Sequence, residues 1–338
     1  MKKILSICAG ILLSASMLFV ACKPGEENTP TINKFFTVED GLLVAKDMPQ
    51  ANSDQEIAVV MNNQVIPGGT SYVSLTSETQ PRTIYVGMKD QLGYYEVPVN
   101  QNRGYDCSFV MMVAQDINLA DGKTVFTIQV ALEDQDGNIS KIWESEVELH
   151  VVGTGTLQVS LTFDNAKDVD LHLIEPEYND EYGNPVSFYE RHIYYGNRFS
   201  QNGGELDLDS NPGCSIDNIN NENITYNDST SYVAPGLYKV YVDLFENCES
   251  SIATNYVVSV FYGGALIATQ QGTNPASGVF PVGAESTYNP ISQDYVAENA
   301  PFISFVIPDH GQKRVKTFEP VPMTESAIEK EAMSAAAR

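Results

Sequence analysis

Short runs of β-favouring residues, bounded by turn residues, fill most of the chain between residues 36 and 152. Val, Ile, Tyr and Thr dominate these runs, and Gly, Pro, Asn and Asp separate them, which is the pattern of antiparallel strands. The expected strands cover residues 57–61, 72–75, 83–88, 94–99, 107–113, 125–132 and 142–151. Their rhythm predicts an all-β, immunoglobulin-like or fibronectin-like sandwich, although a Cys, Trp, Cys framework is missing.

The length of 338 residues favours a second domain, because single cores stop growing near 250 to 300 residues. A Gly153-Thr154-Gly155 joint follows the first sandwich, and the alternating strand that starts at Leu157 opens a new one. We therefore expect two tandem β-sandwich domains, at residues 36–152 and 153–318. In the tail at 319–338, Ser326 and Glu329 form a capping box that predicts one short helix.

The N-terminus has the pattern of a secretory signal, with Lys2 and Lys3 before an apolar run that ends near Cys22. Its end resembles a bacterial lipobox, although Phe19 replaces the usual Leu. The resemblance implies a signal peptide at 1–21, a lipid on Cys22 and a polar tether at 22–35. The alternative is an ordinary signal peptide with a coincidental cysteine.

The charged residues after Cys22 resemble the export signal of surface lipoproteins in some Gram-negative bacteria. They are Lys23, Glu26 and Glu27. The expected location is therefore the outer membrane, with the lipid as the membrane contact and the folded part exposed at the cell surface.

The net charge excludes one class of partner. The chain carries 19 Lys and Arg against 44 Asp and Glu, which gives a net charge of -25. A surface this negative repels phosphate backbones, so we expect no nucleic-acid partner.

Several motifs in the second domain occur in an order that resembles the YfaP-like domain of unknown function, a bacterial envelope family. The similarity covers residues 155–264, and its motifs lie at 168–173, 193–198, 203–209, 222–224 and 235–242. The resemblance implies a compact β-sandwich in secreted proteins and no established activity. The chain departs from the family pattern in a longer stretch at 177–191 and an added loop at 270–300.

Strand alternation in this domain predicts a polar face that carries several carboxylates. Asp168, Asp170 and His172 share the face opposite the core, and Asp207 and Asp209 share another. Three interpretations remain open. The favoured one is a solvated face with Asp168 or Asp170 paired to Arg198; the others are a bound calcium ion and a direct ligand site.

The sequence contains no complete calcium or zinc motif that would decide between these interpretations. The run from Asp207 to Asn211 has the oxygen spacing of a calcium loop, but Pro212 and Asn218 occupy the positions where an EF-hand needs Gly and Glu. A zinc site is improbable, because the histidines show no ligand spacing and His150 is expected on an exposed strand face. The four histidines are His150, His172, His192 and His310.

A disulfide is expected between Cys214 and Cys248. Both cysteines lie in loops of the second domain, whereas Cys107 begins a core strand of the first. An exported protein folds in an oxidising compartment, so this pair is expected to be oxidised.

The sequence carries no phosphate loop, serine elbow or metalloprotease helix. We therefore expect a non-catalytic surface module that binds a glycan or a protein. Four aromatic residues on or beside the 177–191 stretch are its candidate contacts, namely Tyr178, Tyr182, Phe188 and Tyr189. The alternatives are a hydrolase that acts on carbohydrate or peptide and a structural spacer in an envelope assembly.

Overall fold

The computed structural model describes residues 29–99, 105–180, 182–227, 229–248, 251–287 and 291–309. The expected signal peptide, the lipidated Cys22 and the tail helix at 319–338 lie outside these residues. Within the described part, no helix is both long enough and apolar enough to cross a membrane.

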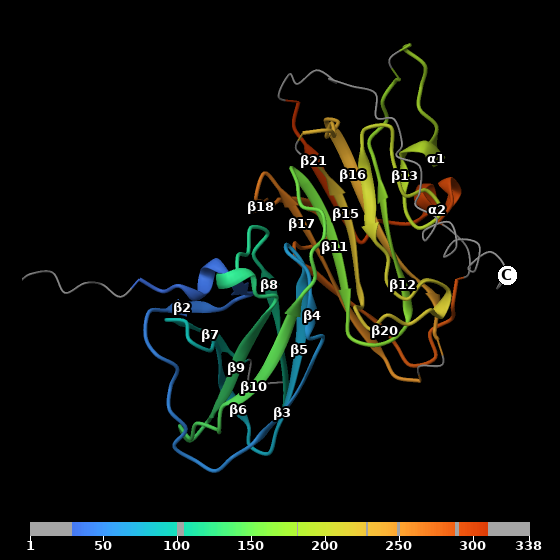
Figure 1. Ribbon diagram of the computed structural model, residues 1–338. Coiled ribbons are helices and arrows are strands. Elements are labelled where there is room, and N and C mark those ends of the chain that lie inside the picture. The colour runs from blue at the N-terminus through green and yellow to red at the C-terminus, as the bar shows by residue number, and fades with distance from the viewer. Residues whose placement is uncertain are drawn as a thin grey trace, which may run out of the picture.

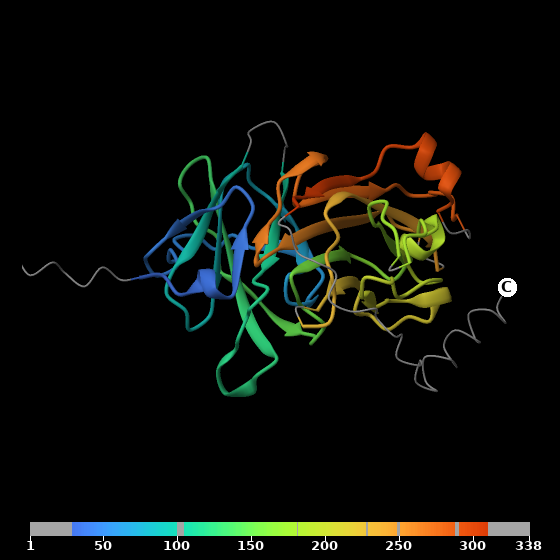
Figure 2. The same ribbon diagram turned by 90° about the horizontal axis from the view of Figure 1, so that it is seen from above.

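The first domain is a sandwich of two sheets, and its strands lie on the left in Figures 1 and 2. One sheet has the order β1-β8-β5-β3, and the other has the order β2-β7-β6-β9-β10-β4. The strands are β1 (Phe36–Val38), β2 (Leu42–Val44), β3 (Ile57–Met61), β4 (Gln64–Val65), β5 (Thr70–Ser77), β6 (Pro81–Met88), β7 (Tyr94–Pro98), β8 (Asp106–Val113), β9 (Val125–Asp134) and β10 (Trp143–Leu149).

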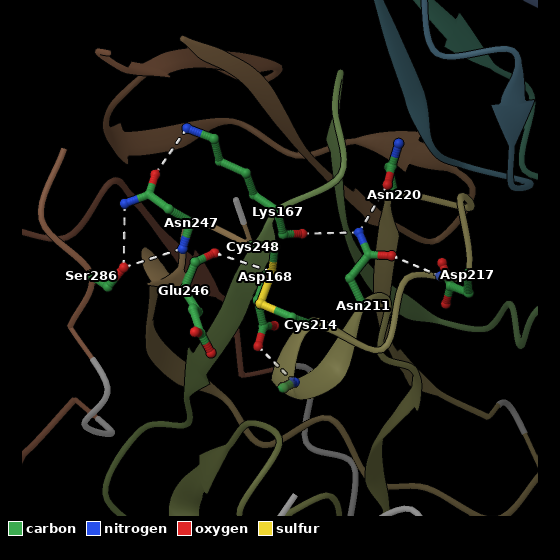
Figure 3. The surroundings of a disulfide bond; sticks show 11 residues. Lys167, Asp168, Asn211, Cys214, Asp217, Asn220, Glu246, Asn247, Cys248 and Ser286 are labelled. Atoms are coloured by element: carbon green, nitrogen blue, oxygen red, sulfur yellow. Dashed lines mark hydrogen bonds between the residues drawn. A yellow bond between two sulfur atoms is a disulfide. The ribbon is translucent and has the colours of Figure 1, made fainter. Parts of the chain in front are cut away.

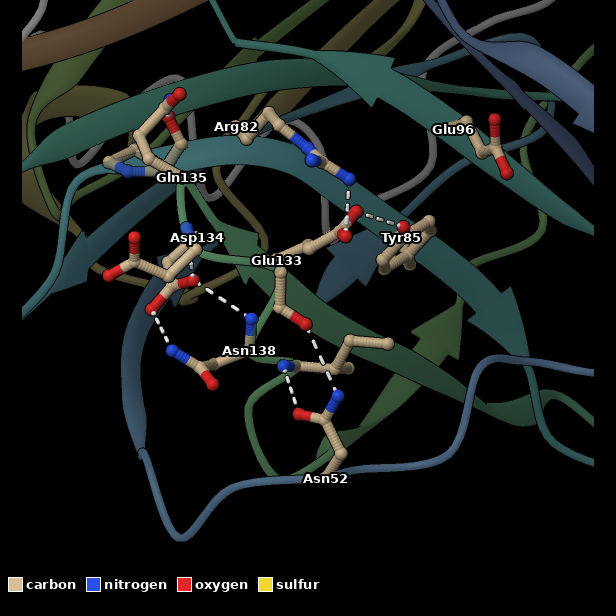
Figure 4. Close-up of polar contacts among 12 residues, drawn as sticks. Asn52, Arg82, Tyr85, Glu96, Glu133, Asp134, Gln135 and Asn138 are labelled. Carbon is tan, nitrogen blue, oxygen red and sulfur yellow. Dashed lines mark hydrogen bonds and ion pairs between the residues drawn. The ribbon is translucent and has the colours of Figure 1, made fainter.

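Alternating apolar residues of the two sheets form the first core, which includes Phe36, Val86 and Ile128. A polar network lies on the outer face of the β6–β9 pair (Figure 4). There Glu133 accepts hydrogen bonds from Arg82 and from Tyr85 Oη, the latter at 2.5 Å. Both oxygens of the Glu133 carboxylate thus have a donor, as the burial of polar atoms requires.

The second domain is also a sandwich of two sheets. One has the order β14-β15-β11-β17-β18, with β20 also paired to β17, and the other has the order β13-β12-β16-β21-β19. The strands are β11 (Leu157–Phe163), β12 (Asp168–Ile174), β13 (His192–Ile193), β14 (Gly204–Leu208), β15 (Asn221–Tyr226), β16 (Gly236–Glu246), β17 (Thr254–Tyr262), β18 (Ala265–Leu266), β19 (Thr269–Gln271), β20 (Ala276–Phe280) and β21 (Ile303–Ile307).

The second core lies between these two sheets and is separate from the first. It includes Leu161, Leu171 and Val258 from the middle strands. The two cores contain residues from Ile32 to Leu149 and from Leu157 to Ile307, so the expected joint at 153–155 falls between them. The prediction of an all-β chain with tandem sandwiches is confirmed.

Two short helices, α1 (Phe188–Arg191) and α2 (Gln293–Glu298), lie over the outer face of the β12 sheet. The other described helices are η1 (Ile32–Lys34) and η2 (Ala120–Gly122) in the first domain and η3 (Pro212–Cys214) in the second. Phe188 of α1 and Ile291, just before α2, pack on Ile174 and Tyr241 of the sheet. The residues around α1 and α2, which belong to the unusual stretches at 177–191 and 270–300, therefore supply a cover, and β12 is buried on both faces. The strand β20, also in the second stretch, pairs instead with β17 of the opposite sheet.

The first domain covers the outer face of the other sheet of the second domain. Polar side chains of β11 and β17 point into this interface, where Gln158 Nε2 donates to Pro67 O at 2.7 Å and Ser259 Oγ donates to Gly68 O at 2.8 Å. Asn221 Nδ2 also donates to Gln64 O at 2.9 Å. Because these buried groups are hydrogen-bonded across the joint, the two sandwiches form one unit.

From these interface contacts we predict that removal of the Gln158 side chain lowers the stability of the protein. Its amide also donates to Asn223 Oδ1 at 2.9 Å and accepts from Gln115 Nε2 at 2.8 Å. Gln158→Ala strands these partners in a buried interface and should lower the free energy of unfolding by about 1–3 kcal/mol in denaturant titrations. The control Gln129→Ala removes a hydrogen bond to Glu144 at the exposed face of β9 and should change stability by less than about 0.5 kcal/mol. Equal losses in both variants would contradict this account of the interface.

Candidate cation site

The candidate site forms where the edge of β12 has no neighbouring strand. β12 pairs with β16 along its whole length, but the short β13 pairs only with Leu173 and Ile174. Glu222 of β15, in the opposite sheet, reaches this open edge, and its Oε2 accepts the backbone N–H of Leu171 at 2.6 Å. The carboxylate thereby takes the place of a missing strand, since a buried N–H group needs an acceptor.

Five carboxyl groups gather at this edge, and we call them the acidic cluster. They are Asp168, Asp170, Asp209, Glu222 and Asp243. One oxygen from each of Asp170, Asp209 and Glu222 lies within 4.8 Å of the other two, and we call these residues the oxygen triad. Asp170 also belongs to a mixed triad with His172 and Asp243, whose ligand atoms lie within the same distance.

The prediction of a solvated face is wrong. Asp168 is 2% exposed, Asp170 is 3% exposed and His172 is fully buried. Strand alternation correctly places these side chains opposite the core, but the cover formed by the residues around α1 and α2 shields that face from solvent. An alternating pattern predicts a wet face only where no further layer packs on the sheet.

Several buried ligand atoms of the site have no hydrogen-bond partner among the described residues. They include Asp168 Oδ1, Glu222 Oε1, Asp243 Oδ1 and His172 Nε2. A buried carboxylate oxygen without a donor costs several kcal/mol, on the order of the desolvation penalty of an ion. Such atoms, when they converge on one point, indicate a bound cation or a bound proton.

Burial and mutual repulsion both act on the protonation of these groups. Burial, together with the charges of Asp209, Asp243 and Glu246 and against the opposing N–H of Gly213, raises the pKa of Asp168 to about 8. Burial likewise raises the pKa of Glu222 well above its usual value, with the largest charge effect from Asp209. Without a cation, the cluster therefore holds protons at neutral pH.

Arg198 balances only part of this charge, and its partner differs from the expected one. The Arg198 guanidinium lies 3.1 Å from Asp209, not against Asp168 or Asp170, and its other N–H groups donate to Leu206 O. Full ionisation of the five carboxyl groups would bring several negative charges close together in a buried region.

Asp207 lies away from the cluster, at the joint between the two domains. Its carboxylate accepts the N–H of Gly153 and, at 2.7 Å, the amide of Asn223. The pairing of β14 with β15 shifts register between Leu206 and Leu208. This bulge breaks the alternation that would have kept Asp207 and Asp209 on one face.

A disulfide holds the loop that lies at one end of the site (Figure 3). Cys214 and Cys248 are bonded, with their Cα atoms 5.2 Å apart, as the sequence predicts. Cys214 ends η3, which lies in the loop between Asp209 and Glu222, and the neighbouring Gly213 N–H donates to Asp168 Oδ2 at 2.8 Å. The disulfide thus ties the loop that joins two members of the oxygen triad to the end of β16.

Only two of the four candidate aromatics are exposed. Tyr182 and Tyr189 are 82% and 63% exposed. Phe188 is buried against the sheet, and half-buried Tyr178 donates its hydroxyl to Glu175 at 2.9 Å. Phe188 is therefore wrong as a partner contact, because it is the residue that fixes the cover to the sheet.

Sequence reasoning missed Glu222, Asp243 and His192 as members of the site or its surroundings. Asp243 lies in a strand whose neighbouring residues are apolar or aromatic, Tyr241-Val242-Asp243-Leu244-Phe245, whereas Glu222 lies between Asn221 and Asn223. An acid inside such a strand is a usable signal, because a buried carboxylate needs a partner. The pairing of these acids with Asp170 depends on topology, which spacing along the chain does not show.

Comparisons with known proteins give only weak similarity to solved structures. No family model and no curated protein matches the chain. Among solved structures, the fibronectin(III)-like modules of Clostridium thermocellum CbhA are 10% identical, with 67% of this chain and 94% of that chain covered and a TM-score of 0.18. BcpA, the major pilin subunit of Bacillus cereus, is 9% identical, with 67% and 66% covered and a TM-score of 0.18. We base no conclusion about function on either match.

The raised pKa values predict an unusual pH dependence for the metal-free protein. Between the unfolded value of an Asp, about 4, and the folded value of Asp168, about 8, the folded state binds more protons than the unfolded state. Stability should therefore fall as pH rises from about 5 to about 8, which thermal melts in EDTA would measure. Asp168→Asn should flatten this dependence, whereas a native protein that becomes more stable over the same range would contradict the raised pKa values.

Proposed function

We propose that the chain is a non-catalytic binding module of a bacterial envelope, in which calcium held by the oxygen triad stabilises the second domain. The observation that carries the calcium assignment is the convergence of three carboxylates within 4.8 Å, from buried Asp170 and Glu222 and half-buried Asp209. Calcium prefers carboxylate oxygens and accepts irregular geometry, so a site made from three different strands and loops suits it.

The enclosure of the triad favours a structural over a catalytic role for the ion. Asp170 and Glu222 are 3% and 1% exposed, so a substrate has no direct path to the ion. A cleft of about 520 Å³ does lie at the domain joint, but its lining includes none of the acidic cluster. A cation that binds only the folded state contributes stability by mass action.

The exposed tyrosines give the proposed module its contact surface. Tyr182 and Tyr189 lie on the segment that leads into β13, and β13 pairs with β12 beside the mixed triad. An ion that fixes β12 would therefore also fix the base of this segment. Exposed aromatic rings suit stacking on sugar rings or anchoring to a protein surface, so the proposed partner is a glycan or an envelope protein.

The lipid anchor and the location at the outer membrane belong to the same proposal. They are supported by the lipobox-like end at Cys22 and by the charged residues that follow it. The motifs that resemble the YfaP-like domain agree with an envelope protein. Several acyl chains, each methylene contributing about 0.8 kcal/mol, would hold the protein to the membrane.

Calcium should raise the melting temperature of the native protein by roughly 5–10 °C at about 100 times its Kd, because it binds only the folded state. Glu222→Gln keeps the shape of the side chain but removes a ligand charge, so this variant should lose the calcium response while its melt in EDTA stays the same or rises. The matched control is Glu148→Gln, at an exposed position of β10, which should respond to calcium as the native protein does.

Two results would contradict the calcium assignment. One is a native protein whose melting temperature is the same in EDTA and in millimolar calcium. The other is a calcium response that Glu222→Gln retains. If calcium has no effect and Arg198→Ala destabilises the protein, the ion pair between Arg198 and Asp209 is the better account of the site.

Cys22→Ser tests the proposed anchor. The native protein should fractionate with membranes and have an intact mass that begins at an acylated Cys22, whereas the variant should lose the acyl mass and appear in the soluble fraction. The anchor would be refuted if the variant were processed and fractionated as the native protein is.

A further inference from the structure

We infer that the mixed triad of Asp170, His172 and Asp243 is a second cation site, which takes a divalent transition metal of the zinc class. This inference goes beyond the proposed function, which needs calcium in the oxygen triad only. The two triads share Asp170 but differ in their remaining ligands, so each can be altered without the other.

The geometry of the mixed triad is that of an enclosed three-ligand site. A ring nitrogen of His172, an oxygen of Asp170 and an oxygen of Asp243 lie within 4.8 Å of one another. His172 is fully buried, and its Nε2 lies 3.4 Å from Asp243 Oδ1. Neither of these two buried ligand atoms makes a hydrogen bond among the described residues.

The groups around His172 hold its ring in place, as the groups around a metal-binding histidine do. Its other nitrogen, Nδ1, lies 2.9 Å from His192 Nε2. Burial, together with the neighbouring His172, lowers the pKa of His192 to about 2, so this second ring is neutral and can accept a hydrogen bond. A histidine that binds a metal through one nitrogen commonly donates from the other nitrogen to an acceptor of this kind.

Tyr194 and Thr287 complete the support of the two side chains. The ring of Tyr194 stacks on His192 at 4.1 Å between centroids and on His172 at 5.5 Å. Thr287 Oγ1 donates to Asp243 Oδ2 at 3.1 Å, which leaves Oδ1 directed at His172. Fixed ligands are what a transition metal requires, because its coordination distances are short and its geometry is defined.

The nitrogen ligand sets the class of metal. Imidazole suits zinc and its first-row neighbours, whereas calcium and magnesium prefer oxygen. Spacing along the sequence argues against zinc, since His172 has no nearby histidine or cysteine in a ligand pattern. The fold supplies ligands that the spacing does not show, because the pairing of β12 with β16 brings Asp243 opposite Asp170 and next to His172.

Metal binding should fix the tautomer of His172. Nε2 must be free of its proton to bind the metal, so the proton lies on Nδ1 and is donated to His192. In the metal-free protein, a proton on Nε2 can instead be shared with Asp243 Oδ1. The two states differ in the nitrogen that carries the proton, which imidazole nitrogen NMR distinguishes.

The test is a zinc titration of the full chain, stripped with EDTA and then saturated with calcium, by calorimetry. The native protein should bind one zinc ion tightly, and His172→Gln should weaken this binding at least about tenfold while it leaves the calcium melting shift unchanged. His150→Gln is the matched control, since His150 lies in the first domain beside Gln64 and should leave zinc binding unchanged. Glu222→Gln should show the opposite pattern, with zinc binding kept and the calcium response lost.

These outcomes separate the two sites. Zinc binding without a calcium response would refute the proposed calcium site and leave this inference standing. A native protein that binds no zinc, or equal zinc affinity in His172→Gln and His150→Gln, would overturn the inference. If His172→Gln fails to fold, nitrogen NMR of the native protein decides. Among only four histidines, one must show a metal-bound Nε2 with a protonated Nδ1, and a zinc-loaded protein without such a ring would also overturn it.

Discussion

The hydrogen bond from the Leu171 N–H to Glu222 is the contact on which the second domain depends most. It joins the two sheets at the edge where β13 ends, and it places a carboxylate where a strand would otherwise lie. Once Glu222 is fixed there, Asp170 and Asp209 lie within 4.8 Å of it, and their repulsion must be relieved by a cation or by protons. The domain's stability is thereby linked to what the cluster binds.

The burial of the cluster follows from layers that lie outside the sandwich. The residues around α1 and α2 cover one sheet, the disulfide between Cys214 and Cys248 holds the loop at its end, and the first domain covers the other sheet. With both outer faces covered, polar residues of β11 and acidic residues of β12 are buried as completely as the core. The low dielectric of such a site strengthens the binding of an ion and raises the cost of leaving one out.

The sequence predicts the architecture well, because strand rhythm and turn residues are local signals. The strands at 57–61 and 107–113, the two tandem sandwiches and the disulfide follow from such signals. The site was predicted only in part. Asp170 and Asp209 belong to it, but Asp207 leaves it through a bulge, and Glu222 and Asp243 join it through pairings between distant strands. A bulge and a covering layer are tertiary features, which alternation along one strand does not reveal.

The most direct test of the central claim is a crystal structure of the calcium-soaked protein, measured at a wavelength where calcium scatters anomalously. The account predicts an anomalous peak between β12 and β15, with oxygens of Asp170, Asp209 and Glu222 at about 2.3–2.6 Å from it. A difference map without a peak there, and with the three carboxyl groups hydrogen-bonded to one another through protons, would contradict it.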